Sequence, residues 1–276
     1  MSNHPKLTVG ESEVDRIIEV VRNVRGIDFS GYSRASFTRR VQRIVDRDAS
    51  GRFSALIDRL SGGGDYMGVF INEVTVNVTE MFRDPEFFLA LRERVIPQLR
   101  DKETIKVWHA GCSTGEEVYS MCIVLHEAGC LGKTEIIATD LNTEALEKAS
   151  RGIIPIKSML DYEQSYINSG GTGKLSDYFQ IDYGSATFSP LLRRSVQFRN
   201  HNLVSDQCIG QFDLIVCRNV LIYFQKPLQS TVVRLFSESL NKRGFLCLGT
   251  KESLLFADDR FAFEEVDPKE KVYRKK

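Results

Sequence analysis

The chain has 276 residues, of which 42% are hydrophobic and 27% are charged. These proportions are ordinary for a globular protein, so they argue against a disordered or fibrous chain. Acidic and basic residues number 37 each, and this balance removes the simplest electrostatic case for a protein that binds nucleic acid or a membrane surface. The length suits one large domain or two.

Six cysteines and four histidines are scattered along the chain without a Cys-x-x-Cys pair, so no zinc site is predicted. Cys217 and Cys247 lie in strand-like apolar runs, where free thiols usually act as small buried side chains, and this favours a reducing compartment. No apolar stretch reaches the roughly 18 residues that a membrane span needs, and residues 1–13 lack the apolar core of a signal peptide. We therefore expect a cytoplasmic monomer that binds no metal and does not insert into a membrane.

The first third of the chain has the pattern of a small all-helical domain. From Ser12 to about Arg94 apolar residues recur at helical spacing, and glycines near positions 31, 51 and 62–64 separate the helical segments.

Residues 33–48 are predicted to form an amphipathic helix with a basic face. Arg39, Arg43 and Arg47 recur one turn apart, with Arg34 and Arg40 at the flanks. Such a stripe is often only a solvated helix face, but guanidinium groups also match carboxylates in bidentate geometry. Both interpretations stay open: a solvated face, or a docking site for an acidic partner. The opposite, apolar stripe consists of Phe37, Val41, Ile44 and Val45.

After Asp101 short apolar or β-branched runs alternate with helical stretches, which predicts a mostly parallel sheet covered by helices. We expect the boundary between residues 90 and 102, giving a helical domain with its linker over 1–92 and a second domain over 93–276. The strand-like runs are Ile105–Ala110, Glu135–Thr139, Val196–Arg199, Asp213–Cys217 and Gly244–Gly249.

Ser169–Arg194 does not fit the alternation and is interpreted as an insertion over about 169–195. It begins Ser-Gly-Gly-Thr-Gly-Lys, but Leu175 stands where a phosphate-binding loop needs Ser or Thr. A flexible turn is therefore expected here, and not a nucleotide triphosphate site.

The strongest local signal is a strand that runs into a turn of small residues and then a helix, Val-Trp-His-Ala-Gly-Cys-Ser-Thr-Gly-Glu-Glu over 107–117. Glycines let the backbone approach a ligand, and amides at the start of the helix can bind its polar parts. The next strand ends at Asp140, where a carboxylate commonly holds a ribose diol. Together these features predict a cofactor that contains adenosine.

Glu116 and Glu117 bear on the kind of adenosine cofactor. Two adjacent carboxylates would repel the pyrophosphate of a dinucleotide, whereas they suit a ligand with an ammonium and a sulfonium group. Electrostatics therefore favours S-adenosylmethionine over NAD.

Five motifs follow one another along the chain: Asn77–Arg83, Ala110–Tyr119, Thr139–Glu144, His201–Leu203 and Cys217–Phe224. Together they resemble the CheR-type methyltransferases, which modify glutamates of chemotaxis receptors. Met81 stands where that family has an aromatic residue, and Val118 stands where it has proline. The resemblance implies a small all-helical domain followed by a Rossmann-like class I methyltransferase domain, whose doubly wound sheet carries a small antiparallel β insert.

The resemblance also implies roles for individual residues. Arg218 and Tyr223 would position the substrate carboxylate, and Arg39, Arg43 and Arg47 would dock the receptor, to which the insert would also attach. S-adenosylmethionine would be bound, with S-adenosylhomocysteine as product, by Asn77, Thr79, Arg83, Glu116 or Glu117, Asp140, Asn202, Leu203, Arg218 and Asn219.

The implied reaction is methyl transfer to glutamate side chains in the cytoplasmic helical region of methyl-accepting chemotaxis receptors. A glutamate with a pKa of about 4.3 is already ionised in the cytoplasm, so no general base is expected. Positioning within a partly dehydrated pocket should supply most of the catalysis. The alternatives are a catalytically silent adapter that binds S-adenosylmethionine in a chemosensory pathway, an NAD-dependent oxidoreductase, and a methyltransferase that acts on nucleic acid or small molecules.

Overall fold

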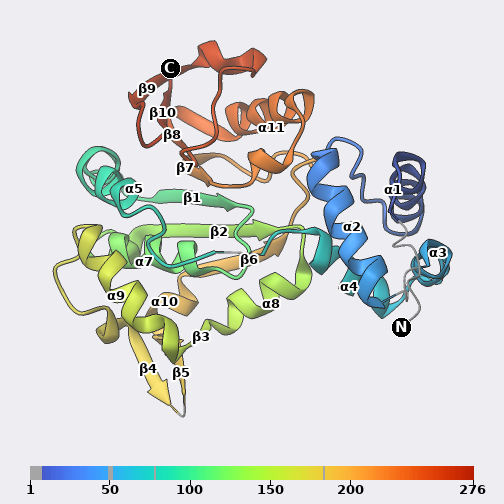
Figure 1. Cartoon of the computed structure of the whole chain (residues 1–276). Coiled ribbons are helices and arrows are strands. Elements are labelled where there is room, and N and C mark those ends of the chain that lie inside the picture. The colour runs from blue at the N-terminus through green and yellow to red at the C-terminus, as the bar shows by residue number, and fades with distance from the viewer. Residues whose placement is uncertain (1–7, 49–51, 78, 183) are drawn as a thin grey trace.

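The N-terminal part of the protein is built from short helices. The computed structural model describes residues 8–48, 52–77, 79–182 and 184–276. The helices lie together at one side of the sheet (Figure 1), and their buried side chains form a separate apolar core. The predicted all-helical domain is therefore confirmed. Its helices are α1 (Glu11–Arg25), α2 (Arg34–Asp48), α3 (Phe53–Ser61) and α4 (Asp65–Val74).

Helix α2 has the amphipathic form predicted for residues 33–48. Its apolar stripe from Phe37 to Val45 is buried in the helical core. Arg39, Arg43 and Arg47 are exposed on the other side. This division arises because residues three and four positions apart lie on the same side of a helix.

The C-terminal part is built on a mixed sheet with strand order β6-β2-β1-β7-β8-β10-β9. The strands from β6 to β8 run parallel, and β9 and β10 add an antiparallel edge. Each parallel strand falls on one of the predicted runs, whereas the edge pair was not predicted. The strands are β1 (Ile105–Ala110), β2 (Thr134–Asp140), β6 (Val196–Asn200), β7 (Phe212–Cys217), β8 (Leu240–Leu248), β9 (Phe263–Asp267) and β10 (Val272–Lys275).

The sheet is doubly wound, with helices on both faces. Alternate residues of β1 serve different cores: Val107 packs with α7 (Glu116–Glu127), and Trp108 packs with α11 (Lys226–Ser239). The chain moves from β1 outward through β2 to β6 and then returns to place β7 on the other side of β1. In such sheets ligands bind at the carboxyl ends of the strands where the order reverses, so the topology points to the ends of β1, β2 and β7.

A small antiparallel sheet of order β3-β5-β4 projects from this part of the fold (Figure 1). The segment predicted as an insertion contains β4 (Phe179–Asp182), β5 (Ser185–Phe188) and α10 (Pro190–Arg194). Two further elements, β3 (Ile153–Pro155) and α9 (Met159–Asn168), precede it. Strand β3 is too short to show a periodic pattern in the sequence. The expected part of the insert in receptor attachment stays a prediction.

The helices that follow the linker pack with the sheet and not with α1–α4. Phe87, Leu91 and Leu99 all lie in the sheet core. They belong to α5 (Pro85–Ala90), a π-helical turn (Leu91–Val95) and α6 (Ile96–Leu99). Helical spacing alone does not reveal which core a helix joins, which is why the expected division at residue 92 lies well beyond the end of α4.

The remaining helix of the α/β part, α8 (Thr143–Arg151), follows β2. None of the helices in the described ranges has the length and apolar character that a membrane crossing requires. Short 3-10 turns occur at Leu131–Lys133, Ile156–Ser158, Leu175–Tyr178, Leu221–Tyr223 and Asp258–Ala262.

Candidate cofactor and substrate site

A pocket lies where the helical domain meets the carboxyl ends of β1, β2 and β7. Its volume is about 1070 Å³ when the open mouth is counted. It brings together nearly all residues of the predicted cofactor set, although they come from segments that are far apart in the sequence. These are Asn77, Thr79, Arg83, Glu117, Asp140, Asn202, Leu203, Arg218 and Asn219, together with Tyr223.

The turn after β1 forms the floor of the pocket. Gly111 has a φ of +77°, and a Cβ atom on it would lie 2.5 Å from a methyl carbon of Val220. The amides of Gly111 and Cys112 donate to the carbonyl of Thr139 at 2.8 and 2.9 Å, which ties the turn to the end of β2. Only glycine meets both the backbone and the space requirement at position 111.

Asp140 closes β2 with its carboxylate in the pocket. Its Oδ2 accepts from the amide of Ser113 at 2.8 Å, and its Oδ1 accepts from the amide of Asn142 at 2.9 Å. Burial raises the pKa of Asp140, and these amides oppose the rise. A carboxylate offers about four lone-pair positions, so acceptor capacity is left for two ligand hydroxyls.

The two adjacent glutamates have different surroundings. Glu117 lines the pocket, whereas Glu116 accepts a hydrogen bond from the Thr114 hydroxyl at 2.7 Å and is absent from the pocket wall. Burial would raise the pKa of Glu117, but the neighbouring Arg218 and His109 outweigh it, so this pKa is lowered. The geometry therefore favours Glu117 as the pocket carboxylate.

Both Nη atoms of Arg218 are paired with carboxylates of the protein. Its side chain is fully buried, with Nη1 donating to Glu117 at 2.7 Å and Nη2 donating to Asp84 at 2.6 Å. The guanidinium also lies 3.9 Å from the centre of the Phe87 ring. Arg218 thus joins the end of β7 to α7 and to the start of α5. Its expected contact with a substrate carboxylate stays a prediction.

A buried carboxylate, Glu252, holds the segment that carries Asn219 and Tyr223. Its two oxygens accept from the amides of Asn219, Ile222 and Gly249 at 3.0, 3.2 and 2.6 Å. Burial raises the pKa of Glu252, against the effect of these amides. No sequence motif contains Glu252, and its place just beyond the last parallel strand is the one signal for it in the sequence.

Residues of the helical domain form the opposite wall. The amide of Ser33 donates to the carbonyl of Tyr223 at 2.7 Å. The Tyr32 ring packs edge-on against the Phe224 ring, with 4.9 Å between the ring centroids. Burial lowers the pKa of the neighbouring Arg40 guanidinium, and its interaction with Tyr223 opposes this. Tyr32 and Ser33 carried no recognisable motif in the sequence.

The segment after β6 completes the pocket next to Asp140. The amide of His201 donates to the carbonyl of Asp140 at 3.1 Å. Asn202 and Leu203 follow and are both buried in the wall. The Asn202 side chain turns back to accept from the amide of Val204 at 3.0 Å, which stabilises this short loop.

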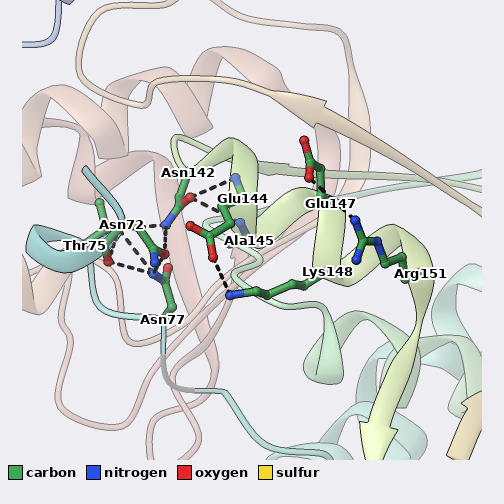
Figure 2. A network of polar contacts seen from close by, with 9 residues as sticks. All are labelled: Asn72, Thr75, Asn77, Asn142, Glu144, Ala145, Glu147, Lys148 and Arg151. Carbon is green, nitrogen blue, oxygen red and sulfur yellow. Dashed lines mark hydrogen bonds and ion pairs between the residues drawn. The ribbon is translucent and has the colours of Figure 1, made fainter. Parts of the chain in front are cut away.

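Asn77, Thr79 and Arg83 reach the pocket from the linker between the domains. The Asn77 amide group donates to the Oδ1 atom of Asn72 at 2.9 Å (Figure 2). The expected docking arginines, Arg39, Arg43 and Arg47, do not line the pocket but lie on the exposed face of α2.

Comparisons with known proteins agree with this arrangement. The family described as CheR methyltransferase, SAM binding domain, matches residues 77–269, and the CheR methyltransferase all-alpha domain matches residues 12–75. The putative methyltransferase Cher3 of Pseudomonas putida is 42% identical over 95% of this chain and 96% of its own length. A chemotaxis protein methyltransferase of Listeria monocytogenes is 31% identical over 86% of this chain and 88% of its own.

The sheet order and the pocket at its switch point define a Rossmann-like class I methyltransferase. The chain belongs to the CheR methyltransferase family and binds S-adenosylmethionine. The pocket fits this cofactor, because Asp140 has acceptor capacity for a diol and Glu117 supplies negative charge for an ammonium group. The family does not favour the alternatives of an NAD-dependent oxidoreductase or a silent adapter.

Replacing Asp140 with alanine should weaken binding of S-adenosylmethionine by at least about 100-fold, because a charged hydrogen bond contributes roughly 1.5–3 kcal/mol and the expected ribose contact has two. Isothermal titration calorimetry measures the loss, and circular dichroism checks the fold. Asp161→Ala, at an exposed position of α9, is the matched control. Unchanged affinity in Asp140→Ala would remove the ribose role.

Replacing Glu252 with glutamine removes a buried carboxyl whose pKa is raised in the folded protein. Such a group favours folding when protonated, so its contribution to the free energy of unfolding falls as pH rises from about 4.3 through the folded pKa. As pH rises, the free energy of unfolding of the variant should therefore fall less steeply than that of the wild type. Urea denaturation at several pH values, with Glu265→Gln as an exposed control, tests this. Parallel slopes for wild type and Glu252→Gln would contradict it.

Proposed function

We propose that the protein transfers the methyl group of S-adenosylmethionine to glutamate side chains in the cytoplasmic helical region of chemotaxis receptors. The products are glutamate methyl esters and S-adenosylhomocysteine, and the reaction takes place in the cytoplasm. The observation that carries this proposal is a pocket with one carboxylate at the end of β2 and another at the start of α7, covered by a helical domain whose exposed face is lined with arginines. The chemotaxis methyltransferases among the relatives support it.

The pocket suggests how the cofactor lies. Asp140 holds the ribose, and Glu117 holds the methionine ammonium because it lines the pocket and Glu116 does not. Asn202, Leu203 and Asn219 surround the adenosine. Asn77, Thr79 and Arg83 close over it from the linker. Arg218 acts as a positioning residue, since it holds Glu117 in place through the 2.7 Å ion pair.

The chemistry needs no group that removes a proton. The acceptor glutamate is ionised, because neutral pH lies well above its usual pKa of about 4.3. One of its oxygens forms a bond to the methyl carbon while the carbon–sulfur bond breaks, and that electron pair goes to sulfur. Negative and positive charge both diminish in this step, so a pocket with little water favours it. Tyr223, half-buried in the pocket wall, helps to orient the acceptor.

The exposed face of α2 is the proposed docking surface for the receptor. Arg39 and Arg43 are exposed one turn apart. Arg47 is partly committed, because it pairs with Asp48 at 2.6 Å and with Glu73 at 2.9 Å. A helix with acidic residues at similar spacing would match this face in charge.

Transfer of label from methyl-labelled S-adenosylmethionine to purified receptor cytoplasmic fragments tests the proposal directly. The expected product releases its label as methanol on base treatment, as an ester does, and peptide mapping places it on glutamate. Absence of base-labile label with active cofactor binding would overturn the glutamate assignment. Label on nucleic acid or on small molecules would favour the alternative substrate classes.

The double charge reversal Arg39→Glu and Arg43→Glu should lower kcat/KM for the receptor by at least about tenfold, because charge attraction steers such encounters. Cofactor affinity should stay unchanged, since neither side chain lines the pocket. A matched control carries the same charge change at exposed positions elsewhere, Arg16→Glu and Arg234→Glu. Receptor methylation at the wild-type rate in the α2 variant would remove the docking role. Arg47 is left in place because its reversal would also break ion pairs within the domain.

A further inference from the structure

A polar network joins the helical domain to the loop after β2, and Asn142 lies at its centre (Figure 2). Asn142 is 2% exposed. Its Oδ1 accepts from the amides of Glu144 and Ala145 at 3.0 and 3.2 Å, and so caps α8. Its Nδ2 donates to Asn72 Oδ1 at 2.8 Å and to Thr75 Oγ1 at 3.1 Å. One side chain therefore both starts a helix of the sheet domain and holds the end of α4.

The same network sets the position of Asn77, a residue of the pocket wall. Asn77 Nδ2 donates to the Oδ1 of Asn72 at 2.9 Å and to its carbonyl at 3.1 Å. Asn72 Oδ1 thus accepts from the amide groups of both Asn77 and Asn142. Loss of Asn142 would leave the Asn72 side chain free to turn, and Asn77 would then lose one of its partners while keeping the bond to the Asn72 carbonyl.

The two residues before Asn142 connect the network to the rest of the pocket. Asp140 Oδ1 accepts from the backbone amide of Asn142 at 2.9 Å. Leu141 packs against the apolar core of the helical domain and also lines the pocket. Asp140 thus faces the cofactor pocket, Leu141 the helical core and Asn142 the polar network.

We propose that Asn142 is a positioning residue for cofactor binding. By holding Asn72 and Thr75 it seats the helical domain on the loop 140–142, and it thereby sets the distance between Asp140 on one wall and Asn77 on the other. This inference rests on the proposed placement of the cofactor between those two residues.

Helix capping alone does not explain an asparagine at this position. A cap needs only an acceptor, and serine supplies one about as well as asparagine does. The Nδ2 group adds donors, which are buried and would be costly to leave without partners. On the other side of the pocket the contact of Ser33 with Tyr223 is independent of this network. Loss of the Asn142 bonds should therefore shift the helical domain at one edge of the pocket while the other edge stays joined.

The decisive variant is Asn142→Ser, which keeps the cap but is too short to reach Asn72 and Thr75. We expect the affinity of the full chain for S-adenosylhomocysteine to fall about tenfold, since two hydrogen bonds of modest net strength are lost. The KM for S-adenosylmethionine should rise by a similar factor, while kcat at saturating cofactor changes little. Hydrogen exchange over residues 72–77 should become faster.

Glu147→Gln is the matched control on the same helix. Its side chain is 71% exposed and faces Arg151 at 4.0 Å (Figure 2), so it should bind the cofactor as the wild type does. A double-mutant cycle between Asn142→Ser and Asn72→Ala measures the coupling. If the network acts as one unit, the double variant loses no more affinity than the single variant that shows the larger loss.

Each outcome decides the inference. Wild-type affinity in Asn142→Ser would overturn it, and so would a lower kcat with an unchanged KM for the cofactor. Losses that add in the double variant would show that the two residues act separately, which also overturns it. The measurements of S-adenosylhomocysteine affinity, hydrogen exchange and double-mutant coupling use no methyl acceptor, so a failure of the receptor assignment leaves them valid. Only kcat and KM depend on the acceptor. A wild-type chain that bound no S-adenosylhomocysteine would instead refute the cofactor placement itself, and the inference with it.

Discussion

The pocket depends on one partly buried carboxylate, Asp140, and on the backbone amides that donate hydrogen bonds to it. A buried charge is costly unless hydrogen bonds compensate it, so the amides of Ser113 and Asn142 must lie where they do. These two amides belong to the turn after β1 and to the loop after β2. A single side chain therefore fixes the relative position of the two segments that form the pocket floor, and the left-handed glycine at position 111 makes the required turn possible.

The helical domain closes this floor through contacts on two sides. On one side the backbone around Ser33 bonds to the segment at Tyr223, and on the other the Asn142 network holds the end of α4. Glu252 stabilises the segment that carries Tyr223, because its carboxylate accepts hydrogen bonds from the amides of Asn219 and Ile222. Residues of both domains therefore line the cofactor pocket and its mouth, and neither domain alone encloses it.

Much of this could be predicted from local sequence, and the rest depends on distant contacts. The parallel strands were identified because strands buried on both faces have continuous apolar runs, as β7 does. The edge strands β9 and β10 lack such runs. The choice between Glu116 and Glu117 depends on how α7 is rotated, since consecutive helical residues point in different directions. Glu252 and Tyr32 approach the site from segments with no motif, so only the fold reveals them.

The placement of positive charge also agrees with the proposed reaction. The acceptor carboxylate loses negative charge on the way to the transition state, so an unpaired cation beside it would stabilise the starting state more than the transition state. Two arginines line the pocket, of which Arg218 is buried and paired with both Glu117 and Asp84, while Arg83 reaches in from the linker. The exposed cations Arg39 and Arg43 lie outside the pocket wall, on α2. Positive charge outside the pocket can attract an acidic partner without stabilising the starting state of the carboxylate that reacts. Recognition and chemistry are therefore assigned to different residues.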